Sequence, residues 1–344
     1  MPDVTGLHHI TAICGDPQEN LDFYAGVLGM RLVKRSVNQD VPGTYHLFYA
    51  DAVGQPGSDL TFFPWPHLRP GRQGLGLATE VSLAVPTGSL AFWAERLERF
   101  GTVPRPVTTR FDELVMPFED PHGLPIALVE TADDRDFTPW GDSPIDVSHQ
   151  VRRLHGVRMD VADVSASATF LKETFDFREV GTESGWLRLG AAAGMRASTV
   201  AGPGAEEAFG GSGRVVDLRS DPESPRGLQG VGTVHHVAWR VSDTEVLAQV
   251  RNRVMHAGRG PTPVIDRFWF QSVYFQEPGS VLFELATDGP GFAVDEDQAQ
   301  LGEQLILPPW LEEQREAIEQ RLPPLTPADP SRLSAATRPA PSSE

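Results

Sequence analysis

The sequence predicts an α+β protein in which four βαβββ modules pair into two open β-barrel domains. Three observations support this fold class. The same order of one strand, one helix and three further strands recurs four times along the 344 residues. Each repeat takes roughly 55–70 residues, which is too few to cover its own sheet face. Two modules that pack together bury that face and enclose a cavity, so four modules form two domains.

The first two modules are predicted at residues 6–66 and 78–131. Their apolar residues recur at helical spacing or in short strand-like runs, which turn residues such as Gly54 and Gly57 separate. Module 1 contains a strand at His8–Ile13, a helix at Asp16–Gly29 and strands at Met30–Val37, Tyr45–Ala50 and Asp59–Pro64. Module 2 contains a strand at Thr79–Val85, a helix at Leu90–Gly101 and a last strand at Ile126–Glu130.

The last two modules are predicted at residues 154–220 and 232–289, after a linker at 132–153 that is rich in Asp, Pro and Ser. Module 3 contains a strand at Leu154–Val161, a helix at Ala166–Phe175 and strands at Arg178–Gly181, Trp186–Leu189 and Arg214–Leu218. Module 4 contains a strand at His235–Val241, a helix at Thr244–Ala257 and strands at Phe268–Phe275 and Ser280–Ala286.

A C-terminal extension is predicted at residues 290–322, after the last module. It contains one amphipathic helix at Pro308–Leu322, with Trp310, Leu311 and Ile318 as its apolar contacts. Residues 323–344 are rich in Pro, Ala and Ser, so we expect a disordered tail there.

The composition excludes several classes of partner. The net charge of −18 opposes binding to nucleic acid or to anionic membrane surfaces. No run of about 18 apolar residues is present, so no transmembrane helix is expected. The N-terminus lacks the basic and apolar regions of a signal peptide. The single cysteine, Cys14, is read as structural and suits a reducing cytoplasm, where we expect the protein. A homo-oligomer remains open.

Two His-His pairs, far apart in the chain, are the strongest indication of function. His8 and His9 open the first strand of module 1, and His235 and His236 open that of module 4. A single carboxylate, Glu284, lies within the last apolar strand of module 4. Two imidazoles and one carboxylate are the ligand set of a facial-triad metal site, which leaves coordination positions open.

Alignment of the modules indicates which of them share this site. Superimposing the first strands places His9 on His236, and the other two modules have Glu80 and Gly156 there. Superimposing the last strands by their turn glycines places Glu284 opposite Phe62, Leu128 and Leu218. Only modules 1 and 4 therefore hold candidate ligands. A site drawn from both requires that these two modules share a barrel.

Strand alternation limits the choice within each pair, because neighbouring side chains point to opposite faces. At most one histidine of each pair can face the cavity. A charged residue in an apolar strand is costly to bury unless it is paired or binds a metal. The structural alternative for Glu284 is an ion pair with Arg or Lys, and the two histidines make the metal the favoured interpretation.

An aromatic stretch at Phe268–Phe275 is expected next to this site, and most of it should be core. Tyr274 differs because its hydroxyl group needs a partner, and it lies across a short turn from the Glu284 strand. Arg267 precedes the stretch and could neutralise a phenolate. His46, near the start of a module 1 strand, is a weaker candidate whose role stays open.

These segments resemble the vicinal oxygen chelate superfamily, which includes glyoxalase I, bleomycin-resistance proteins and extradiol dioxygenases. The likeness is closest to hydroquinone-type ring-cleaving dioxygenases and extends from residue 6 to about residue 311. The segments that carry it are Leu7–Thr11, Tyr45–Asp51, Val234–Val237, Gly279–Glu284, Ala286–Phe292, Asp295–Asp297 and Leu307–Leu311.

The resemblance implies a vicinal oxygen chelate fold and an Fe(II)-dependent enzyme, with Mn(II) as an alternative metal. It makes His9, His236 and Glu284 the metal ligands and places His8 behind them. It makes Tyr274 and Arg267 contacts of substrate or oxygen. The substrates would be O2 and a dihydroxylated aromatic of hydroquinone or catechol type. Our hypothesis is that His8 and Tyr274 manage the protons of ring cleavage.

Two other functions stay open. A glyoxalase-like isomerase or thiol transferase would need a redox-inert metal and usually a fourth protein ligand, and it would consume no oxygen. A protein that binds and sequesters aromatic compounds would need no iron. Oxygen uptake and metal analysis distinguish the three.

Overall fold

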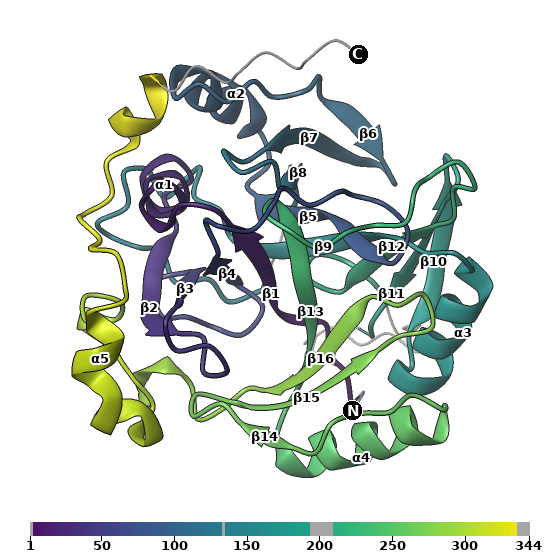
Figure 1. The fold of residues 1–344 in the computed structure, drawn as a ribbon. Helices are drawn as coiled ribbons and strands as arrows, with labels where there is room; N and C mark the ends of the chain where they lie inside the picture. Colours follow the sequence, from purple (N-terminus) through teal and green to yellow (C-terminus); the bar gives the residue numbers. More distant parts are fainter. Residues whose placement is uncertain (1–2, 133–134, 193–208, 336–344) are drawn as a thin grey trace, which may run out of the picture.

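Two eight-stranded sheets, each curled into a half-barrel, form the body of the molecule (Figure 1). The computed structural model describes residues 3–132, 135–192 and 209–335. The strand order of the first sheet is β14-β15-β16-β13-β1-β4-β3-β2, and that of the second sheet is β10-β11-β12-β9-β5-β8-β7-β6.

The first sheet combines strands of module 1 with strands of module 4. Its strands are β1 (Leu7–Cys14), β2 (Arg31–Val37), β3 (Tyr45–Ala50), β4 (Asp59–Pro64), β13 (Thr233–Val241), β14 (Ile265–Asp266), β15 (Gln271–Gln276) and β16 (Leu282–Thr287). In Figure 1 the purple strands of module 1 lie beside the green strands of module 4. The prediction that modules 1 and 4 share a barrel is therefore confirmed.

The second sheet combines modules 2 and 3. Its strands are β5 (Leu77–Val85), β6 (Thr108–Arg110), β7 (Glu113–Glu119), β8 (Pro125–Glu130), β9 (Arg153–Asp160), β10 (Arg178–Glu183), β11 (Trp186–Gly190) and β12 (Val215–Arg219). The longer helices are α2 (Leu90–Arg99), α3 (Val164–Phe175) and α4 (Thr244–His256). Among the described helices, none combines the length and the apolar content that crossing a bilayer requires.

The register of three adjacent strands brings distant residues onto one face. β1 runs antiparallel to β13, with Thr11 opposite His236. β13 runs parallel to β16, with Ala238 opposite Glu284. His9 is two residues from Thr11, so its side chain shares the concave face of the half-barrel with those of His236 and Glu284. A small apolar cluster that includes Phe48, Trp269, Phe270 and Phe292 packs beside this face.

The module counterparts of Glu284 differ from the prediction by one residue. In module 4, Glu284 pairs with Ala238, which lies two residues after His236. The equivalent pairs in modules 1, 2 and 3 are Thr11 with Thr61, Ser82 with Ala127 and Arg158 with Asp217. The counterparts are therefore Thr61, Ala127 and Asp217, in place of Phe62, Leu128 and Leu218. The position of a turn glycine does not determine which residues pair between strands, and a shift of one residue in register moves a side chain to the other face of the sheet.

The first helix is shorter than predicted. Within the segment Asp16–Gly29, α1 spans only Pro17–Leu21, and Asp22–Val27 forms a π-helix. The aromatic stretch is also not a strand throughout, because Phe268 has a φ of 73° and β15 begins at Gln271. Trp269 and Phe270 are thereby turned toward the first half-barrel.

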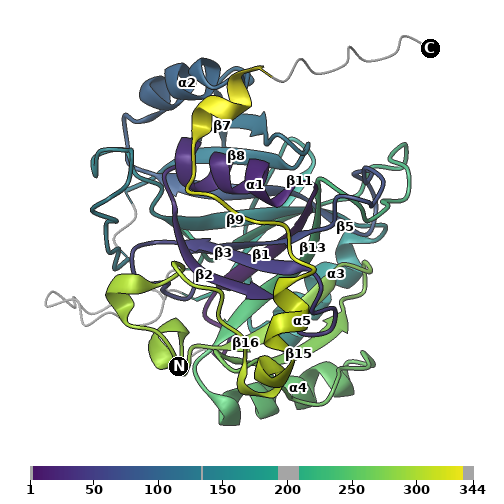
Figure 2. The ribbon, with the colours of Figure 1, turned by 60° about the vertical axis from the view of Figure 1, so that its left-hand side comes forward.

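The C-terminal part differs more. The predicted helix at Pro308–Leu322 is a 3-10 helix at Pro309–Gln314 followed by α5 (Arg315–Glu319). Residues 323–335, predicted as disordered, pack along module 1 (Figure 2). Asp22, almost fully buried, anchors them through an ion pair with Arg332, with 2.7 Å between carboxylate and guanidinium. Residues 336–344 lie outside the described residues.

Candidate metal centre

A pocket opens on the concave face of the first half-barrel, where β1, β13 and β16 lie side by side. Its wall mixes aromatic, imidazole and charged side chains, and its lining residues are His9, Asn38, Gln39, Asp40, His46, Phe48, Phe63, His236, Arg267, Trp269, Phe270, Tyr274 and Glu284. One histidine of each pair lines this pocket, as strand alternation predicts. His8 and His235 point elsewhere.

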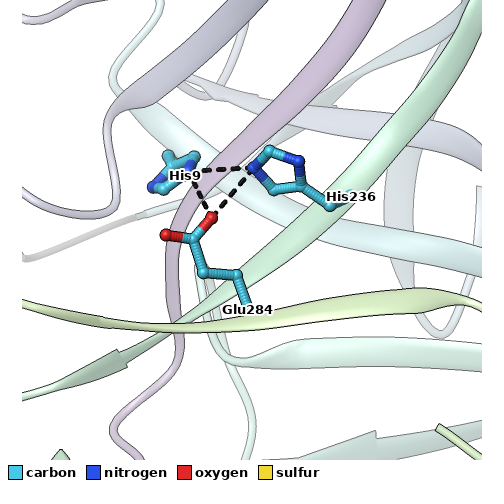
Figure 3. A group of neighbouring side chains, drawn as sticks. All are labelled: His9, His236 and Glu284. Atoms are coloured by element: carbon cyan, nitrogen blue, oxygen red, sulfur yellow. Dashed lines mark hydrogen bonds and ion pairs between the residues drawn. The ribbon is translucent and has the colours of Figure 1, made fainter. Parts of the chain in front are cut away.

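Three donor atoms converge at the base of this pocket (Figure 3). The Nε2 atoms of His9 and His236 are 3.3 Å apart. The Oε2 atom of Glu284 lies 3.2 Å from the former and 2.9 Å from the latter. Neighbouring ligands of one ion lie about 3.0 Å apart when each bond is about 2.1 Å long. The triangle therefore has the dimensions of one face of a coordination shell.

His8 fixes the hydrogen positions of the first pair. Its Nε2 lies 3.1 Å from the carbonyl oxygen of Thr287, which can only accept, so this nitrogen carries a hydrogen. Burial, with the neighbouring His9, lowers the pKa of His8 to about 3, so the ring is neutral. Its Nδ1 is then an acceptor for the Nδ1–H of His9, 2.9 Å away. With Nδ1 of His9 directed at His8, the Nε2 atom of His9 is the nitrogen that faces the pocket.

The second pair repeats part of this arrangement. The Nδ1 atoms of His235 and His236 are 2.8 Å apart. Burial, together with the neighbouring His236, lowers the pKa of His235 to about 3. Burial likewise lowers the pKa of His236. Neutral imidazoles are the form that binds a metal ion.

The carboxylate of Glu284 completes the donor set. Its side chain is 0% exposed, and burial alone would raise its pKa. The contacts with His9 and His236 more than offset burial and hold the pKa of Glu284 well below its usual range. Oε1 accepts a hydrogen bond from Ser272, while Oε2 faces the two imidazoles.

The buried charge of Glu284 favours a cation over the structural alternative. Among the described residues, its ion-pair partners are the two histidines, and no Arg or Lys takes that place. His9, His236 and Glu284 form a group of possible metal ligands whose donor atoms all lie within 4.8 Å of one another. It is the one such group of three or more His, Cys, Asp or Glu side chains among the described residues. Two imidazoles and a carboxylate are donor groups that fit a divalent metal ion.

The upper wall of the pocket carries a second polar group. The Nε atom of Arg267 lies 3.3 Å from the Tyr274 hydroxyl oxygen, and an Nη atom lies 3.0 Å from a carboxylate oxygen of Asp40. Asp40 is 73% exposed, so this ion pair stands at the rim. Burial, and then the charge of Glu284, raise the pKa of Tyr274. Its phenol therefore stays protonated at neutral pH.

Comparison with known proteins identifies the family to which the chain belongs. Residues 6–128 and 153–285 match the family model of the Glyoxalase/Bleomycin resistance protein/Dioxygenase superfamily. The chain belongs to this superfamily. Glyoxalase I from Zea mays has the same fold, with a TM-score of 0.57 at 14% identity over 83% of this chain and 92% of the maize chain.

Several relatives in the superfamily are much more similar. "Putative ring-cleaving dioxygenase MhqO" of Bacillus subtilis (strain 168) is 42% identical over 93% of this chain and 96% of its own length. Chlorohydroquinone/hydroquinone 1,2-dioxygenase of Sphingobium indicum is 30% identical over 90% of this chain and 93% of its own length. The crystal structure of a "putative dioxygenase" from Bacillus subtilis subsp. subtilis (strain 168) has a TM-score of 0.86 at 40% identity, covering 96% of this chain and 100% of that chain.

In this superfamily member, several pocket residues carry no signal in the sequence. Asn38, Gln39 and Asp40 lie in a loop of module 1 and line the pocket, and Gln39 donates to the Arg267 carbonyl oxygen of module 4 at 2.9 Å. Trp269 and Phe270 are buried, as expected for most of the aromatic stretch, and they also line the pocket. Loop contacts between distant modules leave no spacing pattern, so sequence reasoning misses them.

His46 does lie in the pocket wall. Its ring lies between those of Phe48 and Phe63, tilted against both, with ring centroids 3.8 Å and 4.4 Å away. Its Nε2 contacts the Thr61 hydroxyl at 2.9 Å. Burial, and then His9 and His236, lower the pKa of His46 well below its usual value, so the ring is neutral. Thr61 is the module 1 counterpart of Glu284, which explains why His46 faces the same cavity.

The second half-barrel has different chemistry at the same positions. Glu80, Gly156 and Asp217 are the counterparts of His9, His236 and Glu284. Arg158 lies between the two carboxylates, with its Nε 3.3 Å from Asp217 and 3.7 Å from Glu80. The ion pair considered as the alternative for Glu284 thus occurs at Asp217. Asp217 also pairs with Arg188 at 2.7 Å, so guanidinium groups neutralise the buried carboxylate of the second half-barrel.

Proposed function

We propose that this chain is a ring-cleaving dioxygenase that inserts both atoms of O2 into a dihydroxylated aromatic of hydroquinone or catechol type. In this proposal His9, His236 and Glu284 hold Fe(II), with Mn(II) as the alternative ion. The observation that carries the proposal is the triangle of three donor atoms on one side of a pocket walled by aromatic rings. The dioxygenase names of relatives that align over nearly the whole chain support it.

The ion, when bound, supplies open coordination positions at which a diol and O2 meet. The protein supplies the walls and the hydrogen bonds. Phe48, Phe63 and Trp269 offer apolar faces that pack against a flat ring and exclude water. Tyr274 and Arg267 present a phenol hydroxyl and a guanidinium to the oxygen atoms of the substrate. The guanidinium offsets negative charge on a deprotonated diol.

His8 has a different place from Tyr274. It lies behind His9, between that ligand and the Thr287 carbonyl oxygen, and does not line the pocket. We therefore propose that His8 acts through His9, by fixing its tautomer and orientation, and that Tyr274 holds the proton nearest to the substrate. In this proposal both residues control where protons lie during the reaction, His8 on the ligand His9 and Tyr274 next to the substrate.

The set of three donors weighs against a glyoxalase-like isomerase or transferase, which usually needs a fourth protein ligand. Among the described residues no fourth His, Cys, Asp or Glu joins the group. An aromatic-binding protein without catalysis would have no use for the three converging donors.

The test is anaerobic loading with Fe(II), followed by O2-uptake measurements against panels of hydroquinones and catechols. We expect one O2 consumed for each diol and a ring-opened product that contains both oxygen atoms. Protein loaded with redox-inert Zn(II) is the control and should consume none. Bound Fe(II) without O2 uptake on any diphenol would overturn the proposal.

Replacing Tyr274 with Phe should lower kcat by about 100-fold, because loss of a proton-handling group removes a contribution of this size. Bound metal should not change. Single-turnover kinetics with Fe(II)-loaded protein measures the loss. Tyr45→Phe is the matched control, since its hydroxyl donates to the Pro323 carbonyl oxygen outside the pocket. If Tyr274→Phe and His8→Ala both kept full turnover, proton management by these residues would be wrong.

A further inference from the structure

Ser272 contacts the candidate ligand Glu284 from the neighbouring strand. In the β15–β16 ladder, Tyr274 pairs with Glu284 and Ser272 with Ala286. Ser272 is therefore the diagonal neighbour of Glu284 on the same face of the sheet. Both side chains are 0% exposed, and the Ser272 hydroxyl donates to Oε1 of Glu284.

This hydrogen bond makes the two carboxylate oxygens unequal. Oε2 lies 2.9 Å from His236 Nε2 and 3.2 Å from His9 Nε2, so it belongs to the donor triangle. Oε1 is held on the other side by Ser272. The last torsion of a glutamate is soft, and a carboxylate can bind a metal through one oxygen or two. Without a partner for Oε1, the group could turn and offer both oxygens.

Burial alone does not explain the contact. Ser36 on β2 is also 0% exposed, yet its hydroxyl oxygen finds no hydrogen-bond partner among the described residues. A buried serine in this half-barrel therefore need not engage any partner. The hydroxyl of Ser272 donates to one specific oxygen of one ionised group, and hydrogen bonds to ionised acceptors are the stronger kind. It also lies within hydrogen-bond reach of the Tyr274 hydroxyl on the same strand, so it stands between the candidate ligand and a pocket residue.

We propose that Ser272 is a positioning residue that makes Glu284 a ligand through Oε2 alone. This inference rests on the proposed metal role of the triad. A single oxygen from Glu284 would take one coordination position of a bound ion, and three protein donors in all would leave room for a diol and O2 together. A glutamate bound through both oxygens would occupy part of that room.

The experiment measures Mn(II) binding to the metal-free protein by competition with a fluorescent chelator. Ser272→Ala should weaken binding by about 10–100-fold, the usual cost of losing a contact that orients a ligand. The Mn(II) electron paramagnetic resonance spectrum should change as well. Ser272→Thr keeps the hydroxyl group and should restore most of the affinity. Ser36→Ala is the matched control and should bind as the parent does.

The outcomes separate positioning from folding and from the enzyme reaction. Parent-like affinity and spectrum in Ser272→Ala would overturn the proposal, and so would equal losses in Ser272→Ala and Ser272→Thr. The assay needs no substrate. If Mn(II) binding depends on Ser272 but no diphenol supports O2 uptake, the role of Ser272 stands and the dioxygenase proposal fails.

Discussion

Replacement of Glu284 with Gln should abolish tight metal binding and, with it, O2 uptake. The amide is neutral and nearly the same size, so packing is retained while the anionic donor is lost. We expect metal affinity to fall by more than the roughly 100-fold that loss of a supporting contact costs. Elemental analysis after anaerobic Fe(II) loading gives the metal content, and O2 uptake on the best diphenol gives the activity.

Glu277→Gln is the matched control for this change. Glu277 is also buried and lies just before β16, but Ser167 and the Val281 amide hold its oxygens, at 2.7 Å and 3.0 Å. This variant should keep its metal and its activity even if it is less stable. A Glu284→Gln protein that loads Fe(II) fully would exclude Glu284 as a required ligand. Equal loss in both variants would point to a general defect of module 4.

The convergence of His9, His236 and Glu284 could be predicted because three features that determine it can be read from the sequence. Module repeats identify equivalent strands, alternation assigns faces, and burial of a charge requires a partner. Together they also imply that the first and last modules share a sheet, which the strand order confirms. None of these steps needs knowledge of loops or side-chain packing.

The parts that failed depend on contacts between residues far apart in the sequence. The counterpart of Glu284 in module 3 is Asp217 and not Leu218, because ladder register is set by pairing and not by turn glycines. Residues 323–335 pack on module 1, where buried Asp22 binds Arg332, and no local sequence pattern reveals this contact. Ser272 is equally hidden, since a serine in a strand has no distinctive neighbours.

Lys34 is such a hidden residue, and replacing it with Met should destabilise the protein by about 3–5 kcal/mol, the usual cost of breaking a buried ion pair. Its ammonium group is fully buried and lies 2.7 Å from Asp295, in contact with Glu296 and 3.1 Å from the Phe292 carbonyl oxygen. Without it, two largely buried carboxylates would lose their cation. The midpoint of urea unfolding measures the loss.

An exposed pair of the same types provides the control. Lys172 lies 3.2 Å from Glu179, and both side chains are about half exposed. Lys172→Met should therefore cost less than about 1 kcal/mol. Adding Asp295→Asn and Glu296→Gln to Lys34→Met should recover part of the loss, because the unpaired charges are then removed. Equal stability of Lys34→Met and Lys172→Met would show that the buried cation is not needed.

The same cluster reaches the pocket, so the Lys34 variant should also affect substrate binding. Asp295 accepts a hydrogen bond from the indole nitrogen of Trp269 at 2.9 Å, and Trp269 lines the pocket wall. Lys34 thus ties the chain that follows module 4 to β2 of module 1 and holds one wall of the cavity between them. We expect KM for the diphenol to rise more than kcat falls, because the wall packs against the ring and not against the reacting oxygens. A fall in kcat at constant KM would contradict this assignment.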